Sequence, residues 1–375
     1  MQAWTQSPEA VDDGVVRLAV ALGLCGAAVG FFRQDAAPGV AASALGAGVM
    51  LAILYVSYHL IGIRRMGPLW PGLARGLAVG LLLFCLCPPG LPTWLLFALA
   101  ALAVLLEGAL GGLAMPLALS GLLVVWPLAW LWHVFSGLGY VGPFQLRPQI
   151  DPIALWTKFQ LELDPMRLYT GNVAGPLGAT SFGLAMIGFV LLAYIRKASW
   201  AFLLAFFAPI AVAMAITRQS LPTYLINGAA VVFAGVVAAE TRKLPPATWW
   251  KGGAGLLAGA LSAVLLLRGA GYEAYGAGVL AALLLVSLFQ LFGLAGSPAV
   301  IPEGKEKVAH EVAARVRPGR LAALVVFPPA GLALVWRDQA LPRAQRQILA
   351  GLGLVLYLVA VSGAVLWLWV LRLPA

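Results

Sequence analysis

A succession of apolar runs, each close to the length that crosses a bilayer, constrains this chain more than any other feature. A membrane-spanning helix needs about 20 largely apolar residues, and ten such runs precede residue 300. They lie near 14–32, 39–63, 72–88, 92–112, 116–135, 177–195, 199–217, 221–239, 250–267 and 274–295, and two more follow near 321–336 and 347–371. Hydrophobic residues make up 62% of the chain and charged residues only 10%. This composition excludes an ordinary soluble domain and predicts an all-α, polytopic membrane protein.

The distribution of Lys and Arg predicts the orientation of these helices. If residues 1–13 are cytoplasmic and the chain crosses at each run, fifteen basic residues face the cytoplasm and nine face outside. This bias follows the positive-inside rule, so we expect a multi-pass protein of the bacterial cytoplasmic membrane, surrounded by lipid. The predicted organisation is a cytoplasmic N-terminus (1–13), a transmembrane domain (14–295) with a polar outer-face loop (136–176), a charged linker (296–320) and a two-helix C-terminal module (321–375).

Charge and cysteine content narrow the function classes further. The net charge of +10 comes from basic residues scattered over the loops, so we expect no nucleic-acid binding. Cys25, Cys85 and Cys87 all lie in apolar runs, and they are too few for a four-ligand metal site. We expect them to be buried packing thiols, with no metal site. No motif in the chain marks a catalytic residue.

Five segments in a fixed order carry a resemblance to a known family. They are Ser7-Pro8, GLLLFCLCPPGLPTW (80–94) with the glycine-containing turn after it, GNVAGPLGATSFGL (171–184), LINGAAVVFAGVVAAETRKLPP (225–246) and RGAGYEAYG (268–276). In this order and spacing they resemble the membrane flavoproteins that include the D subunit of Rnf electron-transport complexes. The B subunit of the sodium-translocating NADH:quinone oxidoreductase belongs to the same family.

The resemblance implies a fold, partners and cofactors. It implies ten transmembrane helices in two five-helix halves, within a flavin-dependent, ion-coupled electron-transport complex. The implied partners are other integral subunits and an outer-face flavoprotein. In the family, FMN is linked to an outer-face threonine in the pattern D--[ST]GAT, and a second flavin, such as riboflavin, is held non-covalently among the helices. Asp151 and Thr157 keep the spacing of that pattern, so Thr157 is the position that would carry FMN. The other implied cofactor-binding residues are Gly171, Asn172, Gly175, Gly178, Thr180 and Ser181.

Departures from the family pattern favour two alternatives. Ala154, Leu155 and Trp156 replace the small or hydroxyl residues before the threonine, which favours an ordinary loop threonine at 157. One alternative is therefore a flavin-free scaffold or assembly subunit that keeps the fold. The other is a small-molecule transporter, since spans interrupted by Gly or Pro also mark transport sites. The lack of a clear intramembrane charge pair counts against the transporter.

Three further positions carry local predictions. Glu107 ends an apolar run, where an ionisable group is a default functional candidate, and we expect an interfacial carboxylate in contact with water. The glycines at 171, 175 and 178 predict a tight re-entry of the chain, and Thr180 and Ser181 predict a cap on the helix that follows. Asn227, beside Gly228, predicts an amide that bonds across a helix interface.

Overall fold

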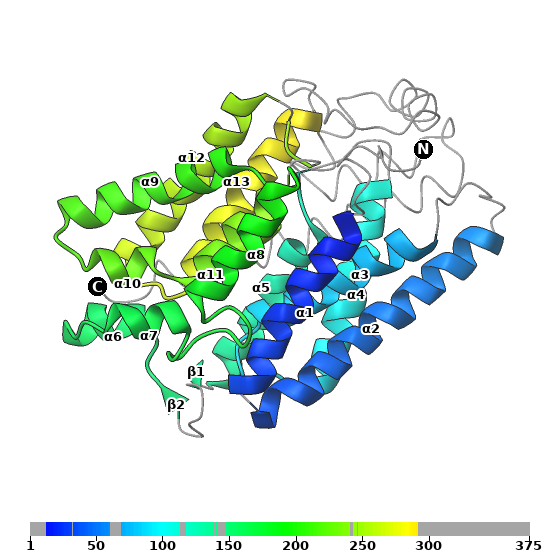
Figure 1. The fold of residues 1–375 in the computed structure, drawn as a ribbon, viewed down its shortest axis with the longest axis horizontal. Coiled ribbons are helices and arrows are strands. Elements are labelled where there is room, and N and C mark those ends of the chain that lie inside the picture. The colour runs from blue at the N-terminus through cyan, green and yellow to red at the C-terminus, as the bar shows by residue number, and fades with distance from the viewer. Residues whose placement is uncertain are drawn as a thin grey trace, which may run out of the picture.

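The chain folds into a bundle of helices (Figure 1). The structure, a computed structural model, describes residues 13–31, 33–60, 69–112, 118–137, 140–141, 148–240, 243–245 and 247–291. Its longer helices are α1 (Asp13–Phe31), α2 (Arg33–Leu60), α3 (Leu69–Leu86), α4 (Thr93–Gly112), α5 (Gly121–Ser136), α8 (Phe182–Tyr194), α9 (Trp200–Ile216), α12 (Thr248–Leu267) and α13 (Glu273–Leu291). The shorter elements are β1 (Tyr140–Val141), β2 (Pro148–Gln149), α6 (Pro152–Phe159), α7 (Pro165–Thr170), α10 (Leu221–Leu225), α11 (Gly228–Val231) and a π-helix, η2 (Val232–Ala238).

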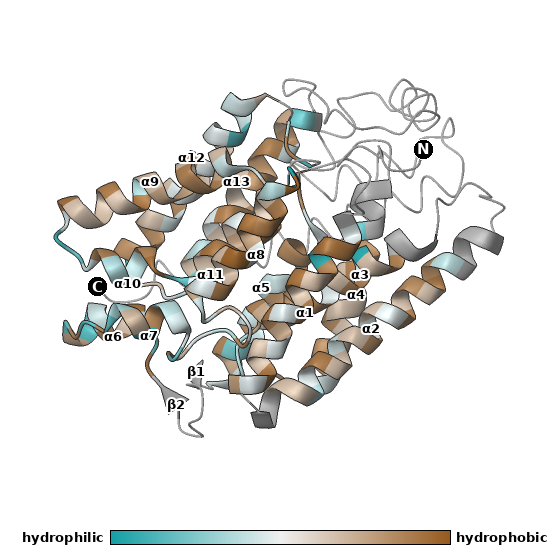
Figure 2. Cartoon of the chain, in the orientation of Figure 1, coloured by the Kyte–Doolittle hydropathy of each residue, from teal (hydrophilic) through white to brown (hydrophobic). Residues whose placement is uncertain are grey.

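Helices occupy all ten positions where the apolar runs before residue 300 predict them. Four described segments are long and apolar enough to cross a membrane, namely Gly14–Phe31, Ala36–Tyr55, Thr248–Leu267 and Glu273–Gln290. These four indicate a multi-pass membrane protein. Figure 2 shows hydrophobic residues along the length of most helices and hydrophilic ones mainly near helix ends and in loops. The runs predicted at 321–336 and 347–371 lie outside the described residues.

Glycines allow the tightest helix contacts. A Cβ on Gly259 of α12 would stand 2.0 Å from the carbonyl oxygen of Phe206 on α9, and one on Gly255 would stand 2.3 Å from that of Phe202. Gly46 of α2 meets the Phe97 carbonyl of α4 in the same way, at 2.2 Å. Small residues at such spacings let two backbones approach closely, which drives helix association in lipid. The pairs α9–α12 and α2–α4 are accordingly packed along much of their lengths.

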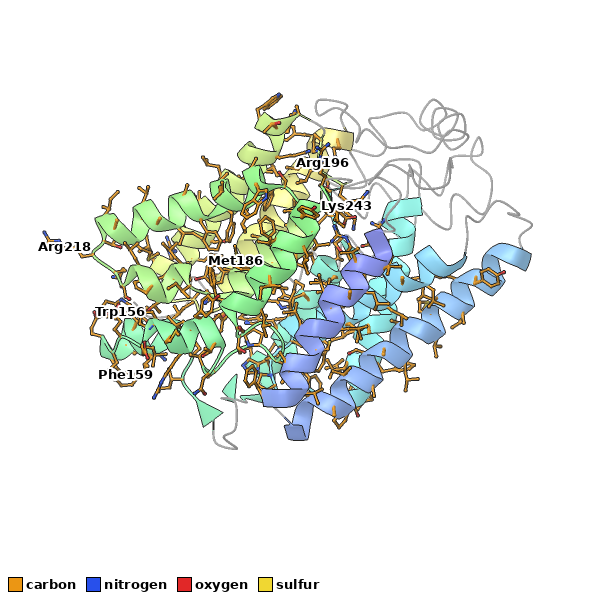
Figure 3. The ribbon with its side chains drawn as sticks, in the orientation of Figure 1. Trp156, Phe159, Met186, Arg196, Arg218 and Lys243 are labelled. Atoms are coloured by element: carbon orange, nitrogen blue, oxygen red, sulfur yellow. The ribbon has the colours of Figure 1, made fainter. Side chains whose placement is uncertain are left out.

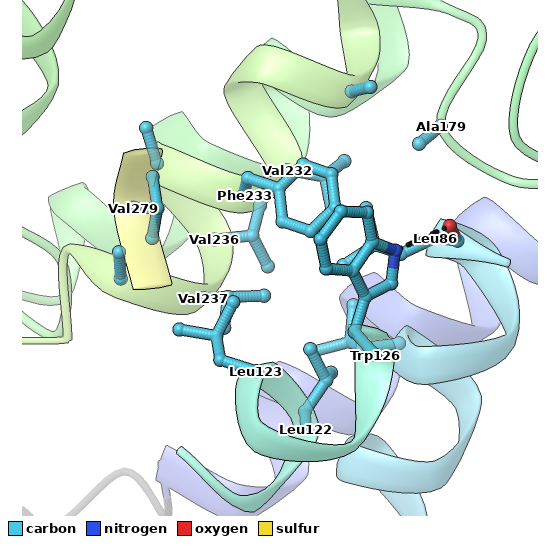
Figure 4. Packing of buried hydrophobic residues seen from close by; sticks show 14 of the residues in the cluster. Leu86, Leu122, Leu123, Trp126, Ala179, Val232, Phe233, Val236, Val237 and Val279 are labelled. Atoms are coloured by element: carbon cyan, nitrogen blue, oxygen red, sulfur yellow. Dashed lines mark hydrogen bonds between the residues drawn. The ribbon is translucent and has the colours of Figure 1, made fainter. Parts of the chain in front are cut away.

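The core between the early and late helices is apolar and aromatic. Trp126 of α5 meets Phe233 of η2 edge-on, with ring centroids 4.8 Å apart, and its indole N–H donates to the Leu86 carbonyl at the end of α3 (Figure 4). That bond satisfies the one polar group of a buried indole. The three cysteines are buried and free, as predicted, and the sulfurs of Cys25 and Cys85 lie 3.5 Å apart.

The run at 221–239 is not one continuous helix. It breaks at Ile226 and Asn227 and then changes to the π-helix η2. The prediction that Asn227 bonds across a helix interface is wrong, because its Oδ1 accepts from the backbone N–H groups of Ala229 and Ala230 and caps α11. A π-helical stretch is rare and frequently marks a functional site.

The predicted polar loop contains small ordered elements. Strands β1 and β2 pair antiparallel, and the two short helices α6 and α7 follow. In Figure 3, Trp156 and Phe159 of α6 lie near Arg218, toward the end of the bundle opposite Arg196 and Lys243. The predicted topology assigns positions 156, 159 and 218 to one side of the membrane and 196 and 243 to the other.

Candidate functional site

The glycine-rich loop between α7 and α8 re-enters the bundle, as its sequence predicts. Gly171 ends α7 with a φ of 89°, in the left-handed region that favours glycine. A Cβ there would stand 2.7 Å from the backbone nitrogen of Ser181, so the two ends of the loop touch. Ser181 caps α8 by accepting from the Leu184 N–H, as predicted, and its hydroxyl donates to the Tyr169 carbonyl.

The same loop contacts three distant segments of the chain. The N–H groups of Leu177 and Gly178 donate to the carbonyls of Cys87 and Cys85 at the broken end of α3. A Cβ on Gly228, where α11 begins, would stand 2.5 Å from the Ala179 carbonyl. Tyr272, which lies just before α13, donates from its hydroxyl to the Ala174 carbonyl at 2.8 Å. Four of the five segments that carry the family resemblance therefore meet in space.

Most of the predicted site residues in this loop are buried. Gly171, Gly175, Gly178, Thr180 and Ser181 are inside, and Asn172 is exposed. A Cβ on Gly178 would stand 2.5 Å from the Cys85 sulfur, and one on Gly175 would stand 3.0 Å from the Tyr272 ring. The glycines thus permit close packing of the loop against protein atoms.

Thr157 lies apart from this loop. It is half-buried near the end of α6, and its hydroxyl donates to the Ala154 carbonyl within the same helix. The neighbouring Trp156 donates from its indole nitrogen to Gln219, beyond the end of α9. Among the described residues, no hydrogen bond joins Thr157 to residues 171–181.

Asp151 begins α6 and has a structural role. Its Oδ1 accepts from the N–H groups of Ile153 and Ala154, at 2.9 Å each. Its Oδ2 and the Oε2 of Glu273 stand 3.2 and 3.1 Å from the point where a Cβ on Gly271 would lie. Asp151 lies outside the helices long enough to cross a membrane. Burial raises its pKa above the ordinary value, against the opposing effect of the two backbone N–H donors.

We expect Asp151→Asn to be more stable than the unchanged chain at about pH 7. An aspartate with a raised pKa in the folded state holds its proton to a higher pH than in the unfolded state. Stability therefore falls as pH rises from the ordinary pKa of about 4 through the raised value. Asparagine keeps the capping oxygen and removes this loss.

Thermal unfolding in detergent from about pH 7 to about pH 4 tests this expectation. The stability advantage of Asp151→Asn over the unchanged chain should shrink on acidification. Asp164→Asn, at an exposed N-cap, controls for the substitution itself. An advantage that grew on acidification would contradict the expectation.

A cluster of buried charges lies at the end of the bundle that the topology assigns to the cytoplasm (Figure 3, Lys243). Its centre is Glu107, near the end of α4, only 8% exposed. One carboxylate oxygen accepts from the ammonium of Lys243 and, at 3.1 Å, from the guanidinium of Arg75. The other oxygen accepts from the Ser120 hydroxyl at 3.1 Å and the Gly121 N–H at 2.9 Å, where α5 begins. The expectation of a water-exposed interfacial carboxylate is wrong, because protein donors have replaced water at both oxygens.

Glu240 provides the second carboxylate of the cluster. Its Oε1 lies 3.1 Å from Arg75 and 3.9 Å from Arg17, and its Oε2 lies 3.6 Å from Lys243. Arg17 of α1 also donates to the Val236 carbonyl in η2, at 2.9 Å. A cavity of about 20 Å³ adjoins the cluster and is lined by Arg17, Arg75, Glu107, Ser120, Glu240 and five apolar side chains. It is large enough for one water molecule with several polar partners.

Sequence reasoning missed this cluster apart from Glu107. Arg75 and Lys243 both pair with Glu107, at the end of the bundle and outside the four segments long enough to cross a membrane. A signal was available. Arg17, Arg75, Glu107 and Glu240 all lie within or beside the ends of apolar runs that the predicted topology places on the same side of the membrane.

Comparison with known proteins adds no relative. No known protein-family profile matches the chain, and no curated protein matches it significantly.

Proposed function

We propose that this chain is the membrane subunit of a flavin-dependent, ion-coupled electron-transport complex, similar to the Rnf D subunit and the B subunit of the sodium-translocating NADH:quinone oxidoreductase. The observation that carries the proposal is the convergence of the family-like segments. Residues 85–87, 228 and 272 are far apart in the sequence and yet all contact the loop at 174–181. Chance matches spread along a chain would have no reason to be neighbours in space.

The pattern of helix packing supports the ten-helix, two-half architecture. In the first half α1 packs on α3, α2 on α4, and α4 on α5. In the second half α8 packs on α11 and η2, α9 on α12, and α12 on α13. The first helix of each half contacts the first of the other, and the last contacts the last. The third helix is interrupted or followed by a break in both halves, at Pro88-Pro89 and at Ile226-Asn227.

The proposed cofactor is a flavin, with non-covalent binding favoured over attachment at Thr157. A covalently attached flavin needs an accessible loop that a transferase can seat, and Trp156, bonded to Gln219, occupies the position next to the acceptor. A flavin held in the membrane subunit would supply one- or two-electron transfer along or across the membrane. The proposed partners are other integral subunits and an outer-face flavoprotein.

The visible absorption spectrum of the detergent-purified chain tests this proposal. We expect the two bands of an oxidised flavin, bleached on addition of dithionite, in protein produced with flavin supplied. Denaturing-gel fluorescence of the chain and of Thr157→Ala, each made with a flavin transferase present, separates covalent from non-covalent binding. We expect both bands to be dark. A spectrum without flavin would contradict the cofactor proposal.

A flavin-free scaffold is the second candidate, and a specific observation favours it. Protein atoms already occupy the space beside the glycines of the family-like loop. Cys85 lies against Gly178, and Tyr272 lies against Gly175. A chain that keeps the fold without the cofactor would still associate with electron-transport subunits. Flavin-free protein that co-purifies with such subunits would identify this role. A transporter is the third candidate, since the cluster around Glu107 brings paired charges together within the bundle.

A further inference from the structure

The ammonium group of Lys243 lies between two buried carboxylates that come from different parts of the chain. Its Nζ bonds to Oε1 of Glu107 and lies 3.6 Å from Oε2 of Glu240. The side chains of Lys243, Glu107 and Glu240 are 8%, 9% and 6% exposed, respectively. Two carboxylate oxygens that converge on one point inside a protein form the type of environment that binds a hard cation. Here a positive charge of the chain itself occupies that point.

The lysine is held in place from its backbone as well as from its ammonium. The Lys243 carbonyl accepts from the side-chain nitrogen of Gln290 on α13, at 3.0 Å, and the Gln290 oxygen accepts from the Ala118 N–H at 2.9 Å. These bonds fix the backbone of Lys243 relative to α13 and to the segment before α5, and the two carboxylates hold its ammonium. The lysine behaves as a cation attached to the bundle.

The other charges around the site fix which free ion would suit it. Arg75 bonds to both carboxylates at 3.1 Å, and Arg17 lies 3.9 Å from Glu240. Loss of Lys243 would thus remove one positive charge from a pair of carboxylates that keep two guanidinium groups nearby. The two guanidinium groups would then balance the two carboxylates, so a monovalent cation would restore the single net positive charge of the intact cluster, whereas a divalent cation would meet twice the repulsion from the arginines. Truncation of the side chain would also remove the ammonium from between the two carboxylates, both of which line the cavity of about 20 Å³.

We propose that Lys243 is a built-in substitute for a monovalent cation. Its ammonium occupies the position between Glu107 and Glu240 that a free sodium or potassium ion would otherwise take, and its removal creates a monovalent-cation site. The intact chain consequently binds no free alkali cation at this position. Any ion that the complex moves must use another route or displace the lysine. This inference does not depend on the presence of a flavin.

Thermal unfolding of detergent-purified protein in NaCl, KCl and choline chloride tests the inference. Choline chloride at the same ionic strength removes the effect of charge screening. We expect the melting temperature of the unchanged chain to be the same in all three salts, within about 1 °C. In choline chloride, Lys243→Ala should melt at a lower temperature than the unchanged chain. Added sodium or potassium should raise that temperature in a saturable way, by about 5 °C or more.

Two variants control for size and charge. Lys243→Met fills the space without a charge, and we expect it to be destabilised with no saturable recovery in NaCl or KCl. Lys243→Arg keeps a positive charge at this position. It should fold, and its melting temperature should be the same in the three salts. The inference is overturned if the unchanged chain shows saturable stabilisation by sodium or potassium. It is overturned equally if Lys243→Ala fails to respond, fails to fold at every salt concentration, or responds no better than Lys243→Met.

Discussion

Replacing Glu107 by leucine is expected to destabilise the folded chain by about 3–5 kcal/mol, the usual cost of removing one partner from a buried ion pair. The substitution leaves the ammonium of Lys243 and the guanidinium of Arg75 facing an apolar side chain. It also removes the acceptor of the Ser120 hydroxyl and the Gly121 N–H. Much of the expected loss is the desolvation cost of the groups left behind. Chemical denaturation in detergent, or the yield of monodisperse protein, would measure it.

Matched variants separate the charge of Glu107 from its hydrogen bonds. Glu107→Gln keeps an acceptor for Ser120 and Gly121, so we expect a smaller loss than with leucine. The double variant Glu107→Leu with Lys243→Met removes both ends of one ion pair, and it should recover part of the stability lost by leucine alone. Arg268→Gln changes an exposed charge and should alter stability by less than about 0.5 kcal/mol. Equal effects of Glu107→Leu and Arg268→Gln would contradict the buried cluster.

Replacing Gly259 by leucine is the second change with a large expected effect. A Cβ alone at this position would stand 2.0 Å from the Phe206 carbonyl of α9. Because this contact joins two backbones, the clash cannot be relieved by a side-chain rotation, and α12 must move away from α9. We expect a loss of about 3 kcal/mol or more, the upper part of the range for overpacking a well-packed interface. Thermal unfolding and size-exclusion profiles in detergent would detect the change.

A control lies on the same helix. Gly253 has no atom within 4 Å of its would-be Cβ, so Gly253→Leu adds the same side chain to an open position. We expect this variant to be close to the unchanged chain, with any difference in the direction of greater stability, because glycine is a poor helix former. If Gly253→Leu were as damaging as Gly259→Leu, the close contact between α9 and α12 would not explain the result.

The parts of the fold that the sequence predicts well are those that depend on local pattern. Each apolar run is long enough to specify its own helix, so helices occur at all ten predicted positions before residue 300. The Ser181 cap also follows from its immediate neighbours, since a hydroxyl before a helix accepts from an N–H three residues on. The break at Asn227 was harder to predict, because the amide of an asparagine suits either a cap or an interhelical bond.

The candidate site depends on contacts between distant residues, which local pattern does not determine. Glu107 and Lys243 are 136 positions apart, and Arg75 and Glu240 are 165 apart. A glutamate at the end of an apolar run can bond either to water or to a lysine, and the local sequence is the same in both cases. The burial of Glu107 could therefore not be derived from its own run. Thr157 shows the converse problem. Its spacing from Asp151 matches a family pattern, yet its hydroxyl bonds only within α6 among the described residues.

The most direct test of the proposed electron-transport role is to purify the tagged chain from its native membranes and measure the bound flavin per chain. We expect a flavin in near-stoichiometric amount, reducible in the preparation, together with other integral subunits that carry redox groups. The chain would then be a working part of an electron-transport complex. A preparation without flavin and without redox-active partners would contradict the proposed function.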